Sequence, residues 1–200
     1  MSLKDTNATG DIEAFNRWSG TYETSWIQHL YFDRLHKRVL RLVTVGSSPQ
    51  CIADVGCGTG RLLRKVRERW SHACLIGVDP AEGMVKKARQ MMPDSTFIIC
   101  PAESIQLPDT SVDLIFSTTS FHHWSDQLQG IREIKRILRP GGQFILADIT
   151  IPQFLLRFIH HGHFRNQSEV RKMFEESGLE VQMQRRLLWG HFLVTVGVRQ

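Results

Sequence analysis

The sequence has no apolar run that approaches the roughly 18 residues a membrane-spanning helix needs. Its first ten residues lack the apolar core of a secretory signal. There is no internal repeat and no low-complexity segment. We therefore expect a cytoplasmic chain with no integral membrane segment. Its 200 residues suit a single domain, and 42% hydrophobic content is enough for a full core.

Cysteine is scarce, and the four cysteines stand singly at positions 51, 57, 74 and 100 with no C-x-x-C pair. Three of them fall in or beside expected strands, where cysteine behaves as a small hydrophobic residue. This spacing argues against a disulfide framework and against a structural metal site. We expect no bound metal.

Acidic residues are outnumbered, and the net charge is +5 with a pI of about 9.3. The densest basic stretch is 61–69, where Leu62, Leu63, Val66 and Trp70 have the spacing of an inner helix face. We expect the basic residues, Arg61 included, to form the solvated face of that helix. Nucleic-acid attraction is the alternative, but no basic run with interleaved aromatic residues supports it.

Apolar runs alternate with segments of helical spacing from residue 51 onward. The expected strands are 51–55, 74–78, 96–100, 112–117 and 143–149, and the helices among them are about 60–70, 81–91 and 126–138. We expect 140–142, Pro-Gly-Gly, to end the last of these helices. Such alternation predicts an α/β fold with a doubly wound, mostly parallel sheet and helices on both faces.

Both ends of the chain differ from this core. Two helices precede it, one containing Phe15 and Trp18 and one over about 26–45. Near the other end, Ser168 is predicted to cap a helix over about 169–177. Strands follow at 179–187 and 191–198, and the short link between them predicts a hairpin. Within one domain, 1–200, we expect a helical lid (1–49), a core (50–150), an insertion with a helix (151–177) and a strand pair (178–200).

The segment 54–60, Asp-Val-Gly-Cys-Gly-Thr-Gly, joins the first expected strand to its helix. Glycines let the backbone turn tightly and let a ligand approach it, and free N–H groups at a helix start attract an anion. The dinucleotide fingerprint would need glycine where Arg61 stands. Asp54 would repel a pyrophosphate on this turn and attract a cation. A ligand with an ammonium, a carboxylate and an adenosine satisfies both features, which indicates S-adenosylmethionine (SAM).

Acidic residues also follow the next two expected strands. Ligands of open parallel sheets lie at the carboxyl ends of the strands. Asp79 can accept hydrogen bonds from both ribose hydroxyls there, and Glu103 can lie beside the edge of an adenine. Taken alone, Asp79 also fits a helix cap before Ala81, and Glu103 fits a solvated residue. Their joint occurrence with the glycine turn favours one nucleoside site.

The sequence resembles the class I SAM-dependent methyltransferases, in the small-molecule branch that includes the ubiquinone and menaquinone C-methyltransferases (methyltransferase type 11 domain). The matching segments are 54–60, 77–79, 102–108, 111–115, 121–126 and 138–142, in the family's order and spacing. Residues 15–23 resemble the entry segment of that branch, which usually ends Tyr-Asp where this chain has Tyr-Glu.

This resemblance implies a Rossmann-like sheet of seven strands with the last strand reversed, and an enzyme that converts SAM to S-adenosylhomocysteine (SAH). It implies methionine recognition near the glycine turn, ribose recognition by Asp79, adenine packing, a residue beside the sulfonium and a lid tyrosine. The implied cofactor residues are Asp54, Gly56, Gly58, Thr59, Gly60, Asp79, Met84, Ala102, Glu103, Thr118 and Tyr22.

The expected reaction is an in-line displacement that moves the methyl group to an unidentified, small and partly apolar acceptor. His122, His123 and Tyr22 are the candidate bases, although both histidines also fit a role in orienting their loop. The segment 154–165 is apolar and aromatic with three histidines, and we expect it to form a lid over the acceptor. Core packing, a metal site and membrane-surface contact are its alternatives.

Three further functions remain open from the sequence. An RNA-directed methyltransferase would account for the basic charge, but 118–121 reads Thr-Thr-Ser-Phe where exocyclic-amine methylases have Asp/Asn-Pro-Pro-aromatic. We therefore expect a small-molecule partner and no nucleic acid. A SAM-binding module without catalysis is the second alternative. An NAD dehydrogenase is a third, disfavoured by Arg61.

Overall fold

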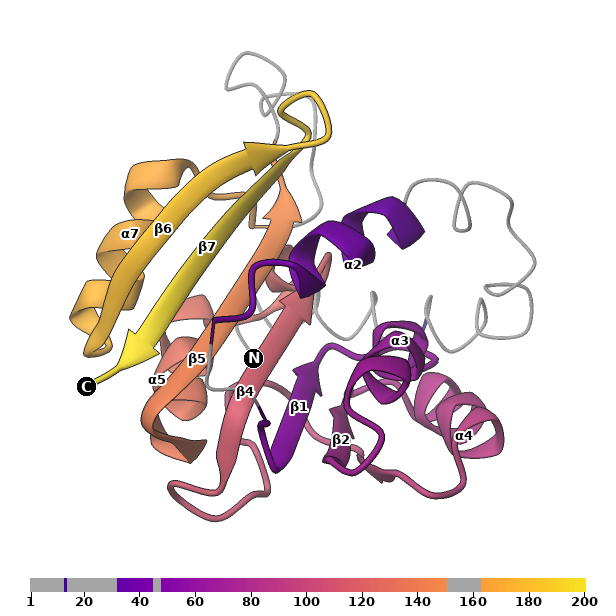
Figure 1. The fold of residues 1–200 in the computed structure, drawn as a ribbon. Coiled ribbons are helices and arrows are strands. Elements are labelled where there is room, and N and C mark those ends of the chain that lie inside the picture. The colour runs from indigo at the N-terminus through magenta and orange to yellow at the C-terminus, as the bar shows by residue number, and fades with distance from the viewer. Residues whose placement is uncertain (1–12, 14–31, 45–47, 151–162) are drawn as a thin grey trace.

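The computed structural model describes residue 13 and residues 32–44, 48–150 and 163–200, and the account below concerns these residues. One sheet of seven strands has the order β3-β2-β1-β4-β5-β7-β6 (Figure 1). The strands are β1 (Cys51–Val55), β2 (Cys74–Val78), β3 (Thr96–Ile98), β4 (Val112–Thr118), β5 (Leu138–Ile149), β6 (Leu179–Leu187) and β7 (Phe192–Arg199). The helices are α2 (Asp33–Leu40), α3 (Arg61–Arg69), α4 (Glu82–Met91), α5 (Gln127–Ile137), α7 (Gln167–Glu176) and the 3₁₀ turn η3 (Phe121–His123).

The strand directions confirm the expected sheet. Strands β1 to β5 pair in parallel, while β7 is antiparallel to both β5 and β6. The residues linking β6 to β7 have positive φ at Leu188, Trp189 and Gly190. This left-handed backbone reverses the chain within a short hairpin and confirms that prediction.

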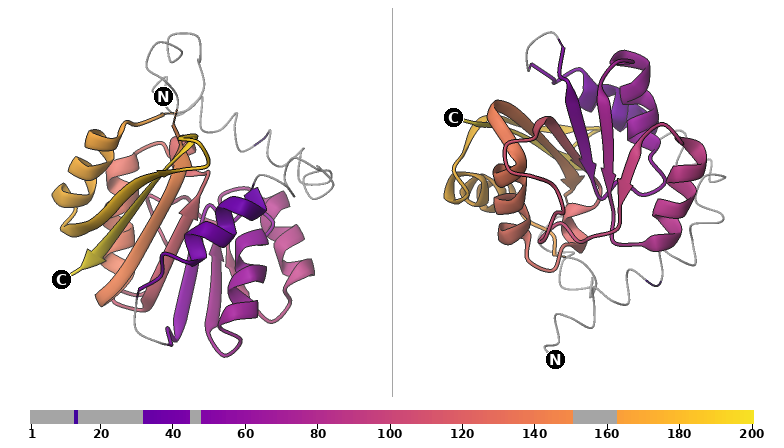
Figure 2. Two further views of the ribbon diagram at one scale, coloured as in Figure 1. Left: turned by 45° about the horizontal axis from the view of Figure 1, so that its top comes forward. Right: turned by 90° about the horizontal axis from the view of Figure 1, so that it is seen from below.

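Helices cover both faces of the sheet, so the core has two layers (Figure 2). On one face α2, α3 and α4 pack on the strands, with Leu63 and Phe116 among the fully buried residues. On the other face lie α5 and α7, where Ile134 and Phe174 pack near Phe144. The parallel strands are apolar on both faces because both are covered. None of the described helices has the length and apolar character needed to span a bilayer.

The topology creates a crevice at the carboxyl end of β1. Strand β1 pairs with β2 on one side and with β4 on the other. The connection after β1 leads to α3 on one face, and the connection after β4 leads to α5 on the opposite face. Connections that leave in opposite directions open a crevice at this switch point, where α/β proteins bind ligands.

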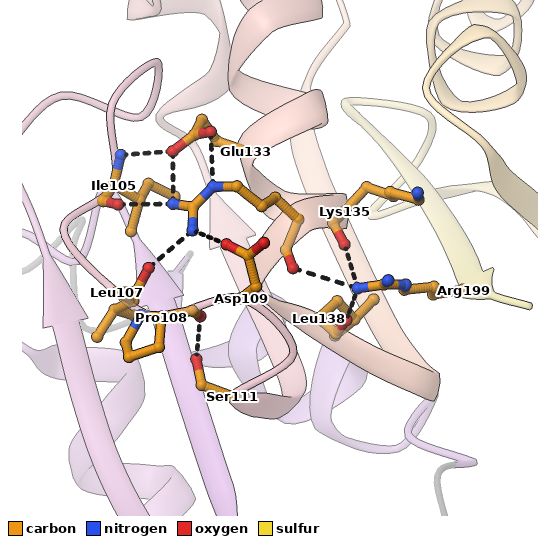
Figure 3. A network of polar contacts seen from close by, with 10 residues as sticks. Ile105, Leu107, Pro108, Asp109, Ser111, Glu133, Lys135, Leu138 and Arg199 are labelled. Carbon is orange, nitrogen blue, oxygen red and sulfur yellow. Dashed lines mark hydrogen bonds and ion pairs between the residues drawn. The ribbon is translucent and has the colours of Figure 1, made fainter.

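Arg136 of α5 anchors the connection from β3 to β4, and Figure 3 shows the polar network to which Ile105 and Glu133 belong. The Arg136 guanidinium donates to both carboxylate oxygens of Glu133, to Asp109 and to the carbonyls of Ile105 and Leu107, at 2.7–2.9 Å. These bonds satisfy backbone carbonyls of a loop that does not pair with a strand. They hold a segment that begins at the crevice.

Several element boundaries differ from those expected. Strand β3 ends at Ile98 instead of residue 100. Strand β5 begins at Leu138, because Val112 pairs with Leu138 before the register jumps to Leu114 and Gln143. Helix α5 already ends at Ile137, so the Pro-Gly-Gly segment at 140–142 does not directly end it as expected but lies in an irregular part of β5.

The helix predicted over 26–45 ends early, since α2 stops at Leu40. Thr44 then pairs with the side chain of Gln143, which accepts from the Thr44 N–H and donates to its hydroxyl. This exchange turns the chain toward the sheet. The other expected N-terminal helix lies outside the described residues apart from residue 13.

Two predictions about single residues were wrong. Asn166, not Ser168, caps α7: its side chain accepts from the Glu169 N–H, and Glu169 accepts from the Asn166 N–H, which forms a capping box. Arg61 is buried instead of solvated, and its Nε donates to Asp33 of α2 at 3.1 Å. That pair joins α2 to the start of α3.

Candidate cofactor and acceptor site

A recess lies at the carboxyl ends of β1, β2 and β4, between α2, α3 and η3. Nine of the eleven predicted cofactor residues line it: Asp54, Gly56, Gly58, Thr59, Asp79, Met84, Ala102, Glu103 and Thr118. Gly60 is absent from the lining, and Tyr22 lies outside the described residues. The structure thus brings together residues that lie up to 64 positions apart in the sequence.

The turn after β1 depends on backbone conformations that favour glycine. Gly56 has φ +78°, and a Cβ added there would lie 2.2 Å from the Ser120 hydroxyl oxygen. Gly58 has φ +52°, and an added Cβ would meet nothing within 4 Å. Gly56 therefore allows close packing between the β1 and β4 connections, whereas Gly58 leaves an open backbone edge that a ligand can approach.

Asp54 is a buried carboxyl group on the floor of the recess. Asp54 is 2% exposed, and its Oδ1 has no hydrogen-bond partner among the described residues. Burial, together with the nearby charge of Asp79, raises the pKa of Asp54 to about 8. A buried carboxyl oxygen of this kind is costly unless a partner binds it, and an ammonium group is a fitting partner.

Asp79 follows β2 and organises the turn beside it. Its Oδ2 accepts from the Gly58 N–H at 2.8 Å, and its Oδ1 accepts from the Ala81 N–H at 2.9 Å. Burial raises the pKa of Asp79, and the two N–H donors partly oppose that shift. Each oxygen retains a second lone pair, which fits a pair of ribose hydroxyls. Asp79 also holds the backbone just before α4, which agrees with the alternative interpretation of this residue as a helix cap.

The far wall of the recess contains Met84, Ala102 and Glu103. Met84 and Ala102 are buried and give this wall an apolar part. Glu103 Oε1 accepts from the Asp126 N–H at 2.9 Å, so its carboxylate ties the β3–β4 connection to the start of α5. This arrangement fits an adenine ring packed on apolar atoms with one polar edge.

The two candidate base histidines have different surroundings. His122 Nδ1 lies 2.8 Å from Asp148 Oδ1, and the backbone N–H of His122 donates to Asp148 Oδ2. The His122 ring also stacks on Phe164. His122 is not among the residues that line the recess, but His123 is. Asp148 and Phe164 therefore hold His122 in its loop, whereas His123 is the candidate histidine that lines the recess.

Only the end of the segment predicted as an acceptor lid is described. Within 154–165, residues 154–162, and with them His160 and His161, lie outside the described residues. The N–H of His163 donates to the carbonyl of His122, and Arg165 donates to Gln127. This end of the segment therefore packs beside η3, next to the recess.

Sequence analysis did not identify the contribution of α2. Phe32 and His36 line the recess from that helix, and Arg61 lines it from α3. A histidine between Leu35 and Val39 falls on the apolar side of the helix and is buried with them. A polar residue on an otherwise apolar face was the available signal, and it is easily taken for core packing.

Residues 53–146 match the methyltransferase domain family Methyltransf_11. A malonyl-[acyl-carrier protein] O-methyltransferase from Serratia marcescens is 32% identical over 153 residues, which cover 74% of this chain and 56% of that protein. A demethylmenaquinone methyltransferase from Thermotoga maritima is 28% identical over 116 residues, covering 58% of this chain and 50% of that protein. The chain spans about half the length of these curated relatives.

The fold is also found in solved structures. In the solved structure described as a complex between the Haloferax volcanii Trm112 methyltransferase activator and the putative methyltransferase, the matching chain superposes with a TM-score of 0.79 at 24% identity, covering 92% of this chain and 96% of that one. Its similarity confirms the seven-stranded Rossmann-like fold. The match over 53–146 and the similarity to the curated methyltransferases show that the chain carries a class I SAM-dependent methyltransferase domain.

Proposed function

We propose that this protein transfers a methyl group from SAM to a small, partly apolar acceptor. The observation that carries the proposal is the buried Asp54 Oδ1, which has no partner among the described residues and lies beside an open glycine turn. A carboxyl group at this place suits the ammonium of an amino acid and opposes a diphosphate. The residues lining the rest of the recess suit an adenosine.

When bound, SAM supplies an electrophilic methyl carbon on a sulfonium. In our proposal Asp54 binds the ammonium, Gly56, Gly58, Thr59 and Gly60 form the turn under the methionine, and Asp79 binds the ribose. Met84, Ala102 and Glu103 enclose the adenine, and Thr118 lies beside the sulfur. The chain's main contribution is alignment of the acceptor with the methyl carbon, which is worth about 7–11 kcal/mol in well-oriented reactions.

The acceptor side of the recess supports a small and partly apolar substrate. Phe32 and Trp124 contribute aromatic surface there, and His123 contributes an imidazole. We propose that His123 accepts a proton when the acceptor must lose one. Tyr22 within 1–49 and the segment 151–177 complete the enclosure in this proposal, around a core of 50–150 and a strand pair of 178–200.

Calorimetry with SAM and SAH, followed by transfer of labelled methyl to a panel of small molecules, tests the proposal. We expect binding of both ligands and label in a small, partly apolar compound. Binding without transfer to any acceptor would favour a SAM-binding module, and label or a mobility shift with tRNA at near-physiological salt would favour an RNA substrate. NADH binding without SAH binding would contradict the proposal.

Asp79→Ala tests the cofactor assignment separately. Loss of hydrogen bonds to a charged group costs about 1.5–3 kcal/mol, so we expect SAM binding to weaken roughly 10- to 150-fold. Asp94→Ala, at an exposed position beyond α4, is the control and should bind as the wild type does. An unchanged dissociation constant in a folded Asp79 variant would contradict the ribose role.

A further inference from the structure

A second buried polar atom without a partner lies in the same recess as Asp54. His36 of α2 is 5% exposed and lines the recess, and its Nδ1 has no hydrogen-bond partner among the described residues. Its other nitrogen, Nε2, lies 3.4 Å from Thr118 Oγ1 at the tip of β4. The ring is thus fixed from one side, and its second nitrogen is left for a ligand.

The surroundings of His36 favour an anionic ligand. Arg61, Arg64 and Lys65 of α3 act on the ring electrostatically, opposed by Asp33 of α2. Three positive charges thus face one negative charge. Burial and these cations lower the pKa of His36 to about 3, so the imidazole is neutral at physiological pH. A neutral ring holds one hydrogen, which sits on Nδ1 when Nε2 accepts from the Thr118 hydroxyl.

The start of α3 adds to this positive environment. Its N-cap, Gly60, has no side chain to cap the helix, and the first turn contains no acidic residue. The positive end of the helix dipole is therefore not compensated within the helix. It points to the same part of the recess, since Arg61 and Leu62 at the start of α3 line it together with His36.

We propose that His36 binds the carboxylate of the SAM methionine by donating a hydrogen bond from Nδ1. The inference rests on the proposed function. Asp54 Oδ1 and His36 Nδ1 are then complementary halves of one site, an acceptor for the ammonium and a donor for the carboxylate. Lid helix α2 thereby recognises the amino-acid half of the cofactor, a role that the glycine turn would share through its N–H groups.

Decarboxylated SAM is the direct probe, because it keeps the sulfonium and the ammonium and lacks only the carboxylate. Calorimetry would compare SAM and decarboxylated SAM with the wild type, His36→Asn, His36→Gln and His36→Leu. The Asn amide reaches the position of Nδ1, whereas the Gln amide reaches that of Nε2. His72→Asn, at an exposed histidine near the start of β2, is the matched control.

We expect the wild type and His72→Asn to bind SAM roughly 10- to 100-fold more tightly than decarboxylated SAM. His36→Leu and His36→Gln should lose most of that preference by weakening SAM binding alone, and His36→Asn should retain it. Nitrogen NMR of histidine-labelled wild type gives a second measurement: the Nδ1 signal of His36 should shift with SAM and stay in place with decarboxylated SAM.

If His36→Leu and His36→Gln weaken the binding of SAM and of decarboxylated SAM equally, or weaken neither, the inference about His36 is overturned. The proposed binding of SAM in the recess is not affected by that outcome. The same holds for a His36 signal that does not respond to SAM in the wild type. If the wild type binds neither ligand, the proposed function fails instead. The two failures are therefore distinguishable.

Discussion

At the scale of single residues, two buried carboxyl groups from different strands occupy one corner of the sheet. Asp54 lies at the end of β1 and Asp79 just after β2, and Asp79 accepts two backbone N–H bonds while Asp54 Oδ1 accepts none from the described residues. The unsolvated carboxyl group next to a second acid is the one whose pKa rises to about 8. Near neutral pH, Asp54 therefore holds a proton until a cation arrives.

SAM binding should release that proton. An ammonium beside Asp54 favours the carboxylate, so below pH 8 binding is coupled to ionisation, and the association constant should rise with pH up to tenfold per unit between about pH 5 and 7.5. Above about pH 8 the α-amino group of the ligand loses its own charge, which ends the rise. Calorimetry in phosphate and in Tris at pH 6.5 measures the protons released.

Asp54→Asn is the control for this coupling. The amide cannot ionise, so we expect weaker SAM binding, little proton release and a flat pH dependence below pH 7.5. Equal proton release by the wild type and Asp54→Asn would show that another group titrates on binding. The assignment of the ammonium to Asp54 would then be incorrect.

The residues that could be predicted from the sequence have local signals. Gly56, Gly58 and Asp54 occur in one heptapeptide, and Asp79 directly ends an apolar run. Arg61 and His36 could not be assigned because their surroundings arise from tertiary packing. The Asp33–Arg61 pair joins two helices 28 residues apart, and a basic helical stretch gives no sign of which arginine faces inward.

At the scale of elements, the spacing of apolar residues predicted the interiors of helices and strands. The ends of these elements depend on polar contacts that this spacing does not show. The Ser168 and Asn166 positions both offer a capping side chain at the start of α7. Glu169 stands three residues after Asn166, and this capping-box spacing was the local signal for the correct cap. The chain that follows α2 is bound at Thr44 by Gln143, 99 residues away, and no local signal could reveal that contact.

Asn166→Ala should destabilise the protein by about 1 kcal/mol, because it removes the acceptor for the Glu169 N–H at the start of α7. Ser168→Ala is the matched control: Ser168 only donates to the Asn166 side chain, and we expect a loss below about 0.5 kcal/mol. Urea unfolding of both variants measures the difference. A larger loss for Ser168→Ala would contradict the assigned cap.

Arg136→Lys tests the anchor of the β3–β4 connection. Lysine keeps the charge but cannot reproduce the planar fork that reaches Glu133, Asp109 and two carbonyls. We expect a loss of about 1–2 kcal/mol in the free energy of unfolding. Arg132→Lys, one turn earlier and exposed, should change it by less than about 0.5 kcal/mol. Similar losses in both variants would show that the network contributes little.

At the scale of the whole molecule, the alternation of strands and helices was enough to predict the sheet and its ligand-binding edge. The reversed strand was predicted from the resemblance and the short hairpin link together. The insertion of β7 between β5 and β6 is a long-range pairing, and the alternation alone did not specify it. The packing of α2 on one face of the sheet is also a long-range contact that the alternation did not specify, and it supplies His36.

Stability of the ligand-free protein should depend on pH through opposed groups of the recess: Asp54 and Asp79, whose pKa values are raised, and His36, whose pKa is lowered. The raised pKa of Asp54, about 8, makes stability fall as pH rises from about 4 to 8, because the native state keeps a proton that the unfolded chain has lost. The lowered pKa of His36, about 3, makes stability rise between about pH 3 and 6.5, because the unfolded chain binds a proton that the native state does not. Their slopes oppose each other up to pH 6.5, and only the decline remains between pH 6.5 and 8.

Urea unfolding from pH 5 to 8 separates the two contributions. We expect the wild type to lose stability mainly above pH 6.5, at up to about 1.4 kcal/mol per unit. Asp54→Asn should remove most of that decline, and His36→Gln should extend it downward to pH 5, because the opposing group is gone. Saturating SAH should flatten the wild-type profile, since its ammonium stabilises the Asp54 carboxylate. A decline in Asp54→Asn as steep as in the wild type would place the titrating group elsewhere.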